Sequence, residues 1–251
     1  MRTLAADTLI LGARSVVRSR RNPATVVSAF IFPLLFFALF FIVMRRVMAA
    51  QGFDYAQLLP PTIVAQAMLF AGMSSAYYVA ADRLSGLTAR LRSMPMHRAA
   101  PILGRAVGDL VRSFISLVPI SVVGVIVGMR FDNALGVVGF ALVALAFGLV
   151  ASLGMGLIGY VASSPDDAVS IASMPYLPLL MLSTGFAPVK NFPGWLQPFV
   201  EWQPVTAVID LLRAFTGEGD VGSTLPVAAA WLSGFGLLFA ALGARAFKKA
   251  S

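Results

Sequence analysis

Long apolar runs separated by short polar segments form the pattern of this chain. Six runs have about the 20 residues that a helix needs to cross a hydrocarbon core about 30 Å thick. They lie near residues 24–44, 58–81, 110–128, 135–161, 167–187 and 224–244. Charged residues make up only 12% of the chain, too few for the polar faces of soluble helices. The pattern predicts an all-α integral membrane protein with six transmembrane helices, in which residues 1–251 form a single transmembrane domain.

Residues 1–22 precede the first run and mix apolar with basic positions. Leu4, Leu11 and Val17 occur together with Arg14 and Arg18 at helical spacing. This spacing predicts an interfacial helix on the inner leaflet, with its arginines at the lipid headgroups. A charge cluster that only sets topology is the alternative, and neither interpretation gives these residues a chemical role.

Basic residues set the expected orientation. Of the 19 Lys and Arg residues, 14 lie before the first run, between the second and third runs, or after the sixth. By the positive-inside rule these three segments share the cytoplasmic side, which an even number of spans allows. We therefore expect a multi-pass protein with both termini in the cytoplasm. The abundance of Ala, Val, Gly and Arg suggests a bacterial chain, and hence the plasma (inner) membrane.

The segment from Asp82 to Pro95, DRLSGLTARLRSMP, is basic and polar and begins where the second run ends. It carries three arginines, Arg83, Arg90 and Arg92, in fourteen residues. A chain this apolar has little reason to keep such a segment unless it stands in water and contacts another molecule. Residues 82–106 are therefore interpreted as a cytoplasmic docking loop.

The segment over residues 184–216 is broken by four prolines and is rich in aromatic residues. The prolines are Pro188, Pro193, Pro198 and Pro204, and the aromatic residues include Phe192, Trp195, Phe199 and Trp202. Proline interrupts helices, whereas tryptophan favours the membrane interface. Residues 186–216 are predicted to form one or two short helices that re-enter the membrane or lie on the outer leaflet, closing the external end of a pathway. A structural aromatic belt is the alternative.

Several classes of activity are disfavoured by counting residues. The net charge of +8 is explained by attraction to anionic inner-leaflet lipid, and no basic patch interleaved with aromatic residues indicates nucleic acid. There is no cysteine, and the one histidine, His97, lies in the basic loop. A Ser-His dyad within a span and His or Cys metal sites are therefore excluded. No GxxxxGK[ST] loop is present to hold nucleotide phosphates, so any ATP must bind to another chain.

Ionisable residues are scarce within the runs, where Gln66 and hydroxyl groups are the clear polar positions. Carriers coupled to protons or sodium ions usually need ionisable groups near the midplane, so the pattern weakens that interpretation. Glycine is frequent, as in the Gly124-x-x-x-Gly128 pair and across residues 148–159. Such residues let helices approach closely, either within one subunit or at a dimer interface.

Together these segments resemble the membrane subunit of type-2 ABC exporters, the permeases that include daunorubicin-resistance and other drug and lipid exporters. The first match is the loop with Asp82-Arg83, Gly86, Leu91-Arg92 and Pro95. The second comprises Ser183 to Pro188 (STGFAP), Pro193, Trp195-Leu196, Gln203 to Thr206 (QPVT) and Leu212-Arg213. The six-span layout extends the resemblance over essentially the whole chain. Asp82, Thr184 and Gln203 stand where the family often has glutamate, serine and asparagine, which leaves the substrate and close subfamily open.

The resemblance implies a cytoplasmic coupling helix within residues 82–95, seated in a groove of a separate ATP-binding subunit. Arg83, Arg90 and Arg92 would meet the acidic surface of that subunit, Gly86 and Pro95 would set the bends, and Asp82 and Leu91 complete the motif. The external gate would comprise Gly185, Pro188, Pro193, Trp195, Trp202, Pro204 and Arg213.

By the same resemblance this chain is a permease and not an enzyme, and it carries no cofactor, because ATP-Mg binds to the partner subunit. The expected partners are that subunit, a second permease chain in a homo- or heterodimer, membrane lipids and a hydrophobic substrate, with no nucleic acid. The expected function is ATP-driven export of a hydrophobic drug, natural product or lipid. A secondary carrier driven by an ion gradient is the main alternative, and an intramembrane enzyme or scaffold is a third.

Overall fold

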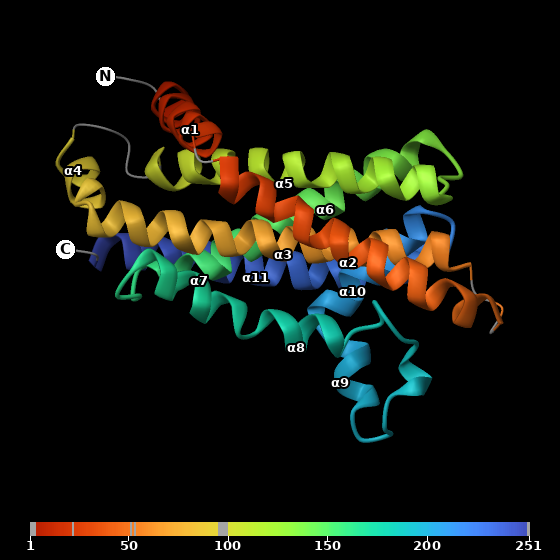
Figure 1. Cartoon of the computed structure of the whole chain (residues 1–251). Helices are drawn as coiled ribbons and strands as arrows, with labels where there is room; N and C mark the ends of the chain where they lie inside the picture. The colour runs from red at the N-terminus through yellow and green to blue at the C-terminus, as the bar shows by residue number, and fades with distance from the viewer. Residues whose placement is uncertain (1–3, 22, 51, 53, 95–99, 250–251) are drawn as a thin grey trace.

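The computed structural model describes residues 4–21, 23–50, 52, 54–94 and 100–249. Every regular element in these ranges is a helix. Figure 1 shows long helices that run side by side along one direction, with α1 (Leu4–Arg21) and α4 (Leu87–Ser93) at the end where α11 finishes. The short helix α9 (Gln197–Trp202) projects from the bundle towards the other end.

Within the described ranges, five helices are long and apolar enough to cross a membrane, which fits a multi-pass membrane protein. They are α2 (Pro23–Ala50), α3 (Tyr55–Leu84), α5 (Ala100–Val127), α6 (Ala134–Gly159) and α11 (Val221–Lys249). The predicted third run begins as a helix ten residues earlier than its apolar stretch, at Ala100. The loop predicted over residues 82–106 is correspondingly shorter.

The prediction of one long helix over residues 167–187 is wrong. This stretch forms two short helices, α7 (Pro165–Ser173) and α8 (Tyr176–Met181), neither of which is long enough to span a membrane alone. Pro175 and Pro178 provide the physical reason, because neither has an N–H group to continue a helical ladder. Hydropathy alone does not register this interruption.

Helix α3 forms the centre of the bundle. It packs against α2, α5, α6, α7 and α10 (Pro204–Phe215), and Leu59, Ile63 and Met68 are fully buried. Its contact with α6 is close because small residues line it. A Cβ atom on Gly72 would lie 3.0 Å from the backbone of Ala151. In the fourth run, a Cβ atom on Gly159 would lie 2.6 Å from the Ala76 carbonyl oxygen. Glycines of that run therefore include positions that pack within this chain, which is one of the two interpretations of their frequency.

Side chains fix several helix ends. Asn133 caps α6 by accepting a hydrogen bond from the Gly136 amide at 2.7 Å. Asp220 precedes α11 and accepts hydrogen bonds from the amides of Gly222 (3.1 Å) and Ser223 (2.9 Å). These bonds favour the ionised carboxylate and lower the pKa of Asp220. The turn before α11 is therefore defined by its own sequence.

Candidate functional site

The docking loop predicted from the sequence contains a short helix, α4, directly after α3. Only Ser85 and Gly86 separate the two helices, and Gly86 has a φ of 71°. The Gly86 amide donates to the Arg83 carbonyl at 3.0 Å, and the Arg90 amide donates to the Gly86 carbonyl at 3.1 Å. The bend expected at Gly86 is therefore present, and a residue with a Cβ atom would be strained there. Pro95, the other expected bend, lies outside the described residues.

Helix α4 has an inward and an outward side. Thr88 is buried and Leu91 is half-buried, whereas Ala89, Arg90 and Ser93 are exposed. The side chain of Arg92 is not among those the structure describes. Arg90 is thus an arginine that α4 exposes on the surface of the bundle.

Arg83 points elsewhere. Its Nη1 donates a hydrogen bond to the Tyr160 carbonyl at 3.0 Å, and its Nη2 donates to the Ala162 carbonyl. Both acceptors lie in the turn between α6 and α7. The expectation that Arg83 meets a partner subunit stays a prediction, and within this chain its guanidinium already has two backbone partners.

Asp82 lies between two arginines from other helices. Its carboxylate oxygens are 3.8 Å from Arg14 of α1 and 4.0 Å from Arg105 of α5. Arg105 also donates to the Tyr160 hydroxyl at 2.9 Å, and its guanidinium lies 5.7 Å from the centre of that ring. These contacts join α1, α3, α5 and the end of α6 at the base of α4.

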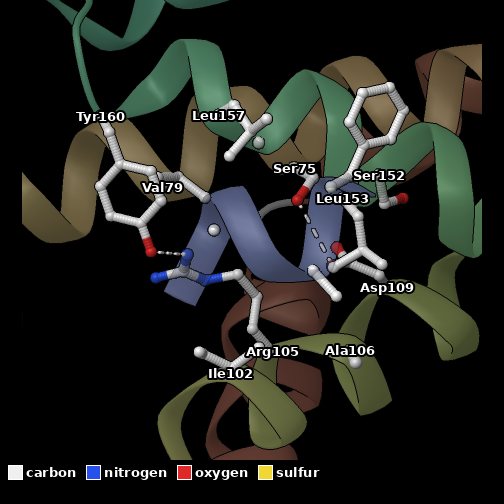
Figure 2. A pocket seen from close by; sticks show the side chains of 14 residues that line it. Ser75, Val79, Ile102, Arg105, Ala106, Asp109, Ser152, Leu153, Leu157 and Tyr160 are labelled. Atoms are coloured by element: carbon white, nitrogen blue, oxygen red, sulfur yellow. Dashed lines mark hydrogen bonds between the residues drawn. The ribbon is translucent and has the colours of Figure 1, made fainter. Parts of the chain in front are cut away.

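A small cavity of about 30 Å³ lies beside these contacts, between α3, α5, α6 and α11 (Figure 2). Its polar lining includes Ser75, Arg105, Asp109, Ser152 and Tyr160. Such a volume holds a water molecule but no drug-sized ligand. The cavity as it stands is therefore too small to hold a drug-sized cargo.

Sequence reasoning missed a buried ion pair in α5. Asp109 and Arg112 bond to each other, and both side chains are less than one tenth exposed. Ser75 donates to Asp109 at 3.3 Å, and the Arg112 guanidinium lies 4.8 Å from the centre of the Tyr78 ring. The available signal was the spacing of three residues between opposite charges beside an apolar run, which places both on one helix face.

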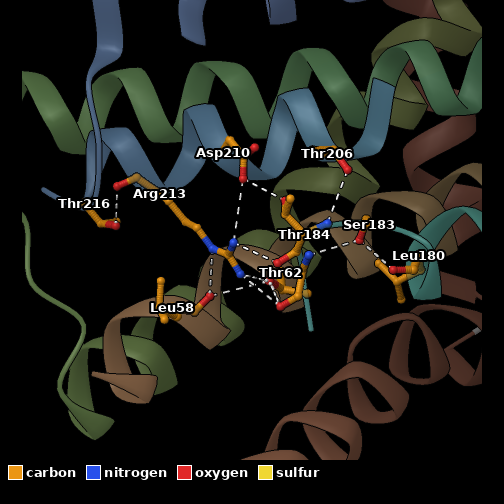
Figure 3. Close-up of polar contacts among 10 residues, drawn as sticks. Leu58, Thr62, Leu180, Ser183, Thr184, Thr206, Asp210, Arg213 and Thr216 are labelled. Carbon is orange, nitrogen blue, oxygen red and sulfur yellow. Dashed lines mark hydrogen bonds and ion pairs between the residues drawn. The ribbon is translucent and has the colours of Figure 1, made fainter. Parts of the chain in front are cut away.

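At the other end of the bundle, Arg213 of α10 joins three segments (Figure 3). It donates hydrogen bonds to the carbonyls of Leu58 (3.3 Å), Thr184 (2.9 Å) and Gly185 (2.9 Å). It also lies 3.7 Å from a carboxylate oxygen of Asp210. The guanidinium is thus occupied by groups of its own chain.

The stretch Ser183 to Pro188, singled out from the sequence, packs directly on this arginine. The Thr184 hydroxyl donates to Asp210 at 2.7 Å, and the Thr184 amide donates to the Thr206 hydroxyl at 3.3 Å. The Gly185 carbonyl accepts a hydrogen bond from Thr62 at 3.0 Å. A Cβ atom on Gly185 would lie 2.6 Å from the Thr62 methyl group, so glycine allows this approach. The structure therefore brings Gly185 and Arg213 together.

The prolines divide the remainder of this segment as predicted. Pro188 precedes a 3₁₀ turn, η1 (Val189–Asn191), and Pro204 begins α10. Pro193 lies between η1 and α9, outside any helix. Trp195 is 81% exposed and Trp202 67% exposed. Residues 186–216 thus contain the short helices η1, α9 and α10, whereas their re-entrant or interfacial location and their role as a gate stay predictions.

A larger cavity, of about 300 Å³, lies beside Arg213. Its walls come from the end of α2, the start of α3, residues 184–189 and α10, and they are mostly apolar. Tyr55, Thr184, Asp210 and Arg213 supply its polar groups. Its volume is in the range that accepts part of a drug-sized molecule.

The fold and these two ends define a helical membrane protein that carries a short helix outside the bundle at one end and a proline-broken segment at the other. The family model described as ABC-2 type transporter matches residues 6–215, and this chain belongs to that family. It is a membrane permease subunit of an ABC transporter.

Curated relatives are similar over most of the chain. A daunorubicin resistance ABC transporter permease protein, DrrB1, of Streptomyces coeruleorubidus is 28% identical over 238 residues, which cover 93% of this chain and 84% of that protein. The doxorubicin resistance ABC transporter permease protein DrrB of Mycobacterium tuberculosis is 34% identical over 166 residues, covering 66% of this chain and 57% of that protein. The resemblance to the type-2 permeases is thereby confirmed.

Proposed function

We propose that this chain is the membrane subunit of an ATP-driven exporter that moves a hydrophobic drug, natural product or lipid out of the cytoplasm or the inner leaflet. The observation that carries the proposal is α4, which stands at the end of the bundle shared by α1 and the end of α11, with Arg90 exposed. A helix of seven residues in that place suits a groove of a separate subunit. Family membership is what implies that this subunit binds ATP.

In this proposal α4 seats in the ATP-binding subunit, and Arg90 faces acidic groups there. ATP-Mg binds to that subunit, and its closure on a second copy displaces α4. Because only Ser85 and Gly86 separate α4 from α3, the displacement reaches the central helix of the bundle. No chemical step takes place in the permease itself.

The cargo is proposed to be hydrophobic for two reasons. The relatives bear the names of resistance proteins for daunorubicin and doxorubicin. The 300 Å³ cavity beside Arg213 is also mostly apolar, which suits a hydrophobic molecule near the exit. Residues 186–216 would close this end until the cargo leaves.

A dimer in the bacterial plasma membrane is part of the same proposal. Helices α2 and α11 bury little of their surface within one chain, which leaves apolar faces for lipid or a second permease. Both termini would be cytoplasmic, because the basic segments that precede α2 and end α11 follow the positive-inside rule.

The test is affinity purification of the tagged protein in mild detergent, with an assay of the eluate for vanadate-sensitive ATPase activity. We expect a stoichiometric ATP-binding partner that is lost in the Arg90→Glu variant and kept in the Arg46→Glu variant, where an exposed arginine of α2 is changed instead. Uptake of doxorubicin added outside inverted vesicles then tests the direction of transport, because export from the cell corresponds to uptake into such vesicles. Uptake driven by a proton gradient in the absence of ATP would favour the secondary carrier instead.

A further inference from the structure

Arg83 bonds to two interhelical connections, the one between α3 and α4 and the one between α6 and α7. Its main-chain carbonyl accepts the hydrogen bond from the Gly86 amide that shapes the start of α4. Its side chain donates to the carbonyls of Tyr160 and Ala162, which are 77 and 79 residues further along the chain. One residue therefore links the base of α4 with the turn that leads into α7.

The two carbonyls that Arg83 binds belong to the end of a helix. The last carbonyl groups of a helix have no partner within it and need one from elsewhere. In the α6–α7 turn, the amides of Val161 and Ala162 both bond back to the Ile158 carbonyl, so the carbonyls that follow are left for another donor. Arg83 fills this place with two N–H groups on one rigid plane, which a lysine does not have.

Neighbouring charges hold the same joint from a second side. Asp82 is adjacent to Arg105, and Arg105 bonds to the Tyr160 hydroxyl. The side chain and the carbonyl of Tyr160 are thus both tied to the end of α3 (Figure 2 shows the Arg105 contact). A displacement of the α3 end would therefore act on the α6–α7 turn through these contacts.

The α6–α7 turn leads to the opposite end of the molecule. Helix α7 packs along α3, α8 continues it, and the chain then enters Ser183 to Pro188. That stretch is held by Arg213 through the Thr184 and Gly185 carbonyls. The turn that Arg83 holds is therefore the first element of a continuous path to the 300 Å³ cavity.

We propose that Arg83 is a positioning residue that passes a displacement of α4 to the α6–α7 turn, and so to α7 and α8, and that it is not a contact for the ATP-binding subunit. This inference rests on the proposed function, because α4 is displaced only if an ATP-binding subunit seats on it. It divides the basic residues of the loop into Arg90, which docks, and Arg83, which transmits.

The experiment uses the absence of native cysteine. Ser163, in the α6–α7 turn, is exposed, so a Ser163→Cys variant carries the only thiol and can be labelled with a maleimide dye. The complex with its copurifying ATP-binding subunit is labelled without nucleotide and after trapping with ATP and vanadate. We expect trapping to change the labelling rate about fivefold or more.

Arg83→Ala in this background is expected to copurify with the ATP-binding subunit in the unchanged ratio but to abolish the response of the Ser163→Cys label to trapping. Arg83→Lys keeps the charge and loses the paired N–H groups, so it should give an intermediate response. Tyr160→Phe is the matched control, because it removes the Arg105 bond and leaves the carbonyl that Arg83 binds, and its response should persist.

The outcomes separate the two proposals. A full trapping response in Arg83→Ala overturns the transmission role while α4 docking stands. Loss of the ATP-binding subunit from Arg83→Ala, with Arg90→Glu still binding, also overturns it, because Arg83 would then be the docking contact. If no ATP-binding subunit accompanies the wild-type chain, the proposed function itself fails.

Discussion

Arg83 and Arg213 have the same structural role at the two ends of the bundle. Each donates to backbone carbonyls where the chain leaves helical geometry, at residues 160–162 and at residues 184–185. Water is scarce in a bilayer, so carbonyls freed from a helix need donors from the protein. Arginine suits this task because its planar group serves several acceptors and stays charged.

Arg213→Ala is expected to lower stability by about 3–5 kcal/mol, because it leaves the Thr184 carbonyl without a donor, leaves the Gly185 carbonyl with Thr62 alone, and removes the ion pair of Asp210. The measurement is the fraction of protein that stays monodisperse in detergent after heating. Arg46→Ala, which changes an exposed arginine, should match the wild type. Equal melting of both variants would show that the Arg213 contacts are not stabilising.

Gly86 gives a prediction that isolates backbone conformation. A Cβ atom there would meet nothing within 4 Å, so any effect of a small side chain comes from its φ of 71°. We expect Gly86→Ala to cost roughly 1–2 kcal/mol at this joint and to reduce ATP-driven transport, with Gly86→Asn closer to wild type. The measurement is the rate of doxorubicin transport into inverted vesicles by the wild type, Gly86→Asn and Gly86→Ala, which should decrease in that order. An asparagine variant worse than the alanine variant would contradict this explanation.

Single residues also show how far the sequence could predict the site. The basic loop was found because Arg83 and Arg90 interrupt an apolar pattern, but nothing in the sequence places the partners of Arg83 nearly eighty residues away. Asp109 and Arg112 lie at the start of the run predicted over residues 110–128, where hydropathy treats a charge as a boundary even where a partner satisfies it. Long-range pairing is the information that a local pattern lacks.

At the scale of elements, apolar length predicted the long helices and failed where a helix is interrupted. The runs that became α2, α3, α5, α6 and α11 were found because each is continuous in hydropathy. The run over residues 167–187 is also apolar, yet Pro175 and Pro178 divide it. In the proline-broken segment that follows, the prolines are dense and accompanied by polar residues, and this pattern is what indicated short helices there.

The contact between α1 and α5 yields a prediction about an element. Cβ atoms on Gly104 and Gly108 would lie 2.5 and 2.6 Å from the Cβ atoms of Leu11 and Ser15, so the two helices touch through glycine. Gly108→Val should push α1 away and destabilise the protein by about 1–3 kcal/mol, measured as a lower melting temperature in detergent.

The control for this contact is Gly234→Ala in α11, where a Cβ atom would meet nothing within 4 Å. Alanine favours a helix over glycine, so this variant should melt at the same temperature or higher. Equal melting temperatures for Gly108→Val and Gly234→Ala would show that α1 does not pack on α5 through these glycines. The membrane interface alone would then hold α1 in place.

For the whole molecule, the two ends differ in character. The Asp82 contacts and α4 lie at one end, whereas the Arg213 contacts, the exposed tryptophans and the 300 Å³ cavity lie at the other. Helix α3 connects them and is buried along most of its length. The movement proposed to begin at α4 would therefore have a packed route to the far end, and the interrupted α7–α8 pair would be a second route beside it.

Whether α7 and α8 together cross the membrane decides the topology. Residues 165–181 number about 17 and would extend about 26 Å at 1.5 Å per residue, slightly less than the thickness of the hydrocarbon core. The stretch from Ser183 to Pro188, which follows, adds to this length. We therefore expect Ser163→Cys to be labelled only from the cytoplasmic side and Gly194→Cys only from outside. An impermeant maleimide applied to intact cells and to inverted vesicles measures this, since the chain has no other thiol. Labelling of both variants from one side would mean five spans and would place the two termini on opposite sides.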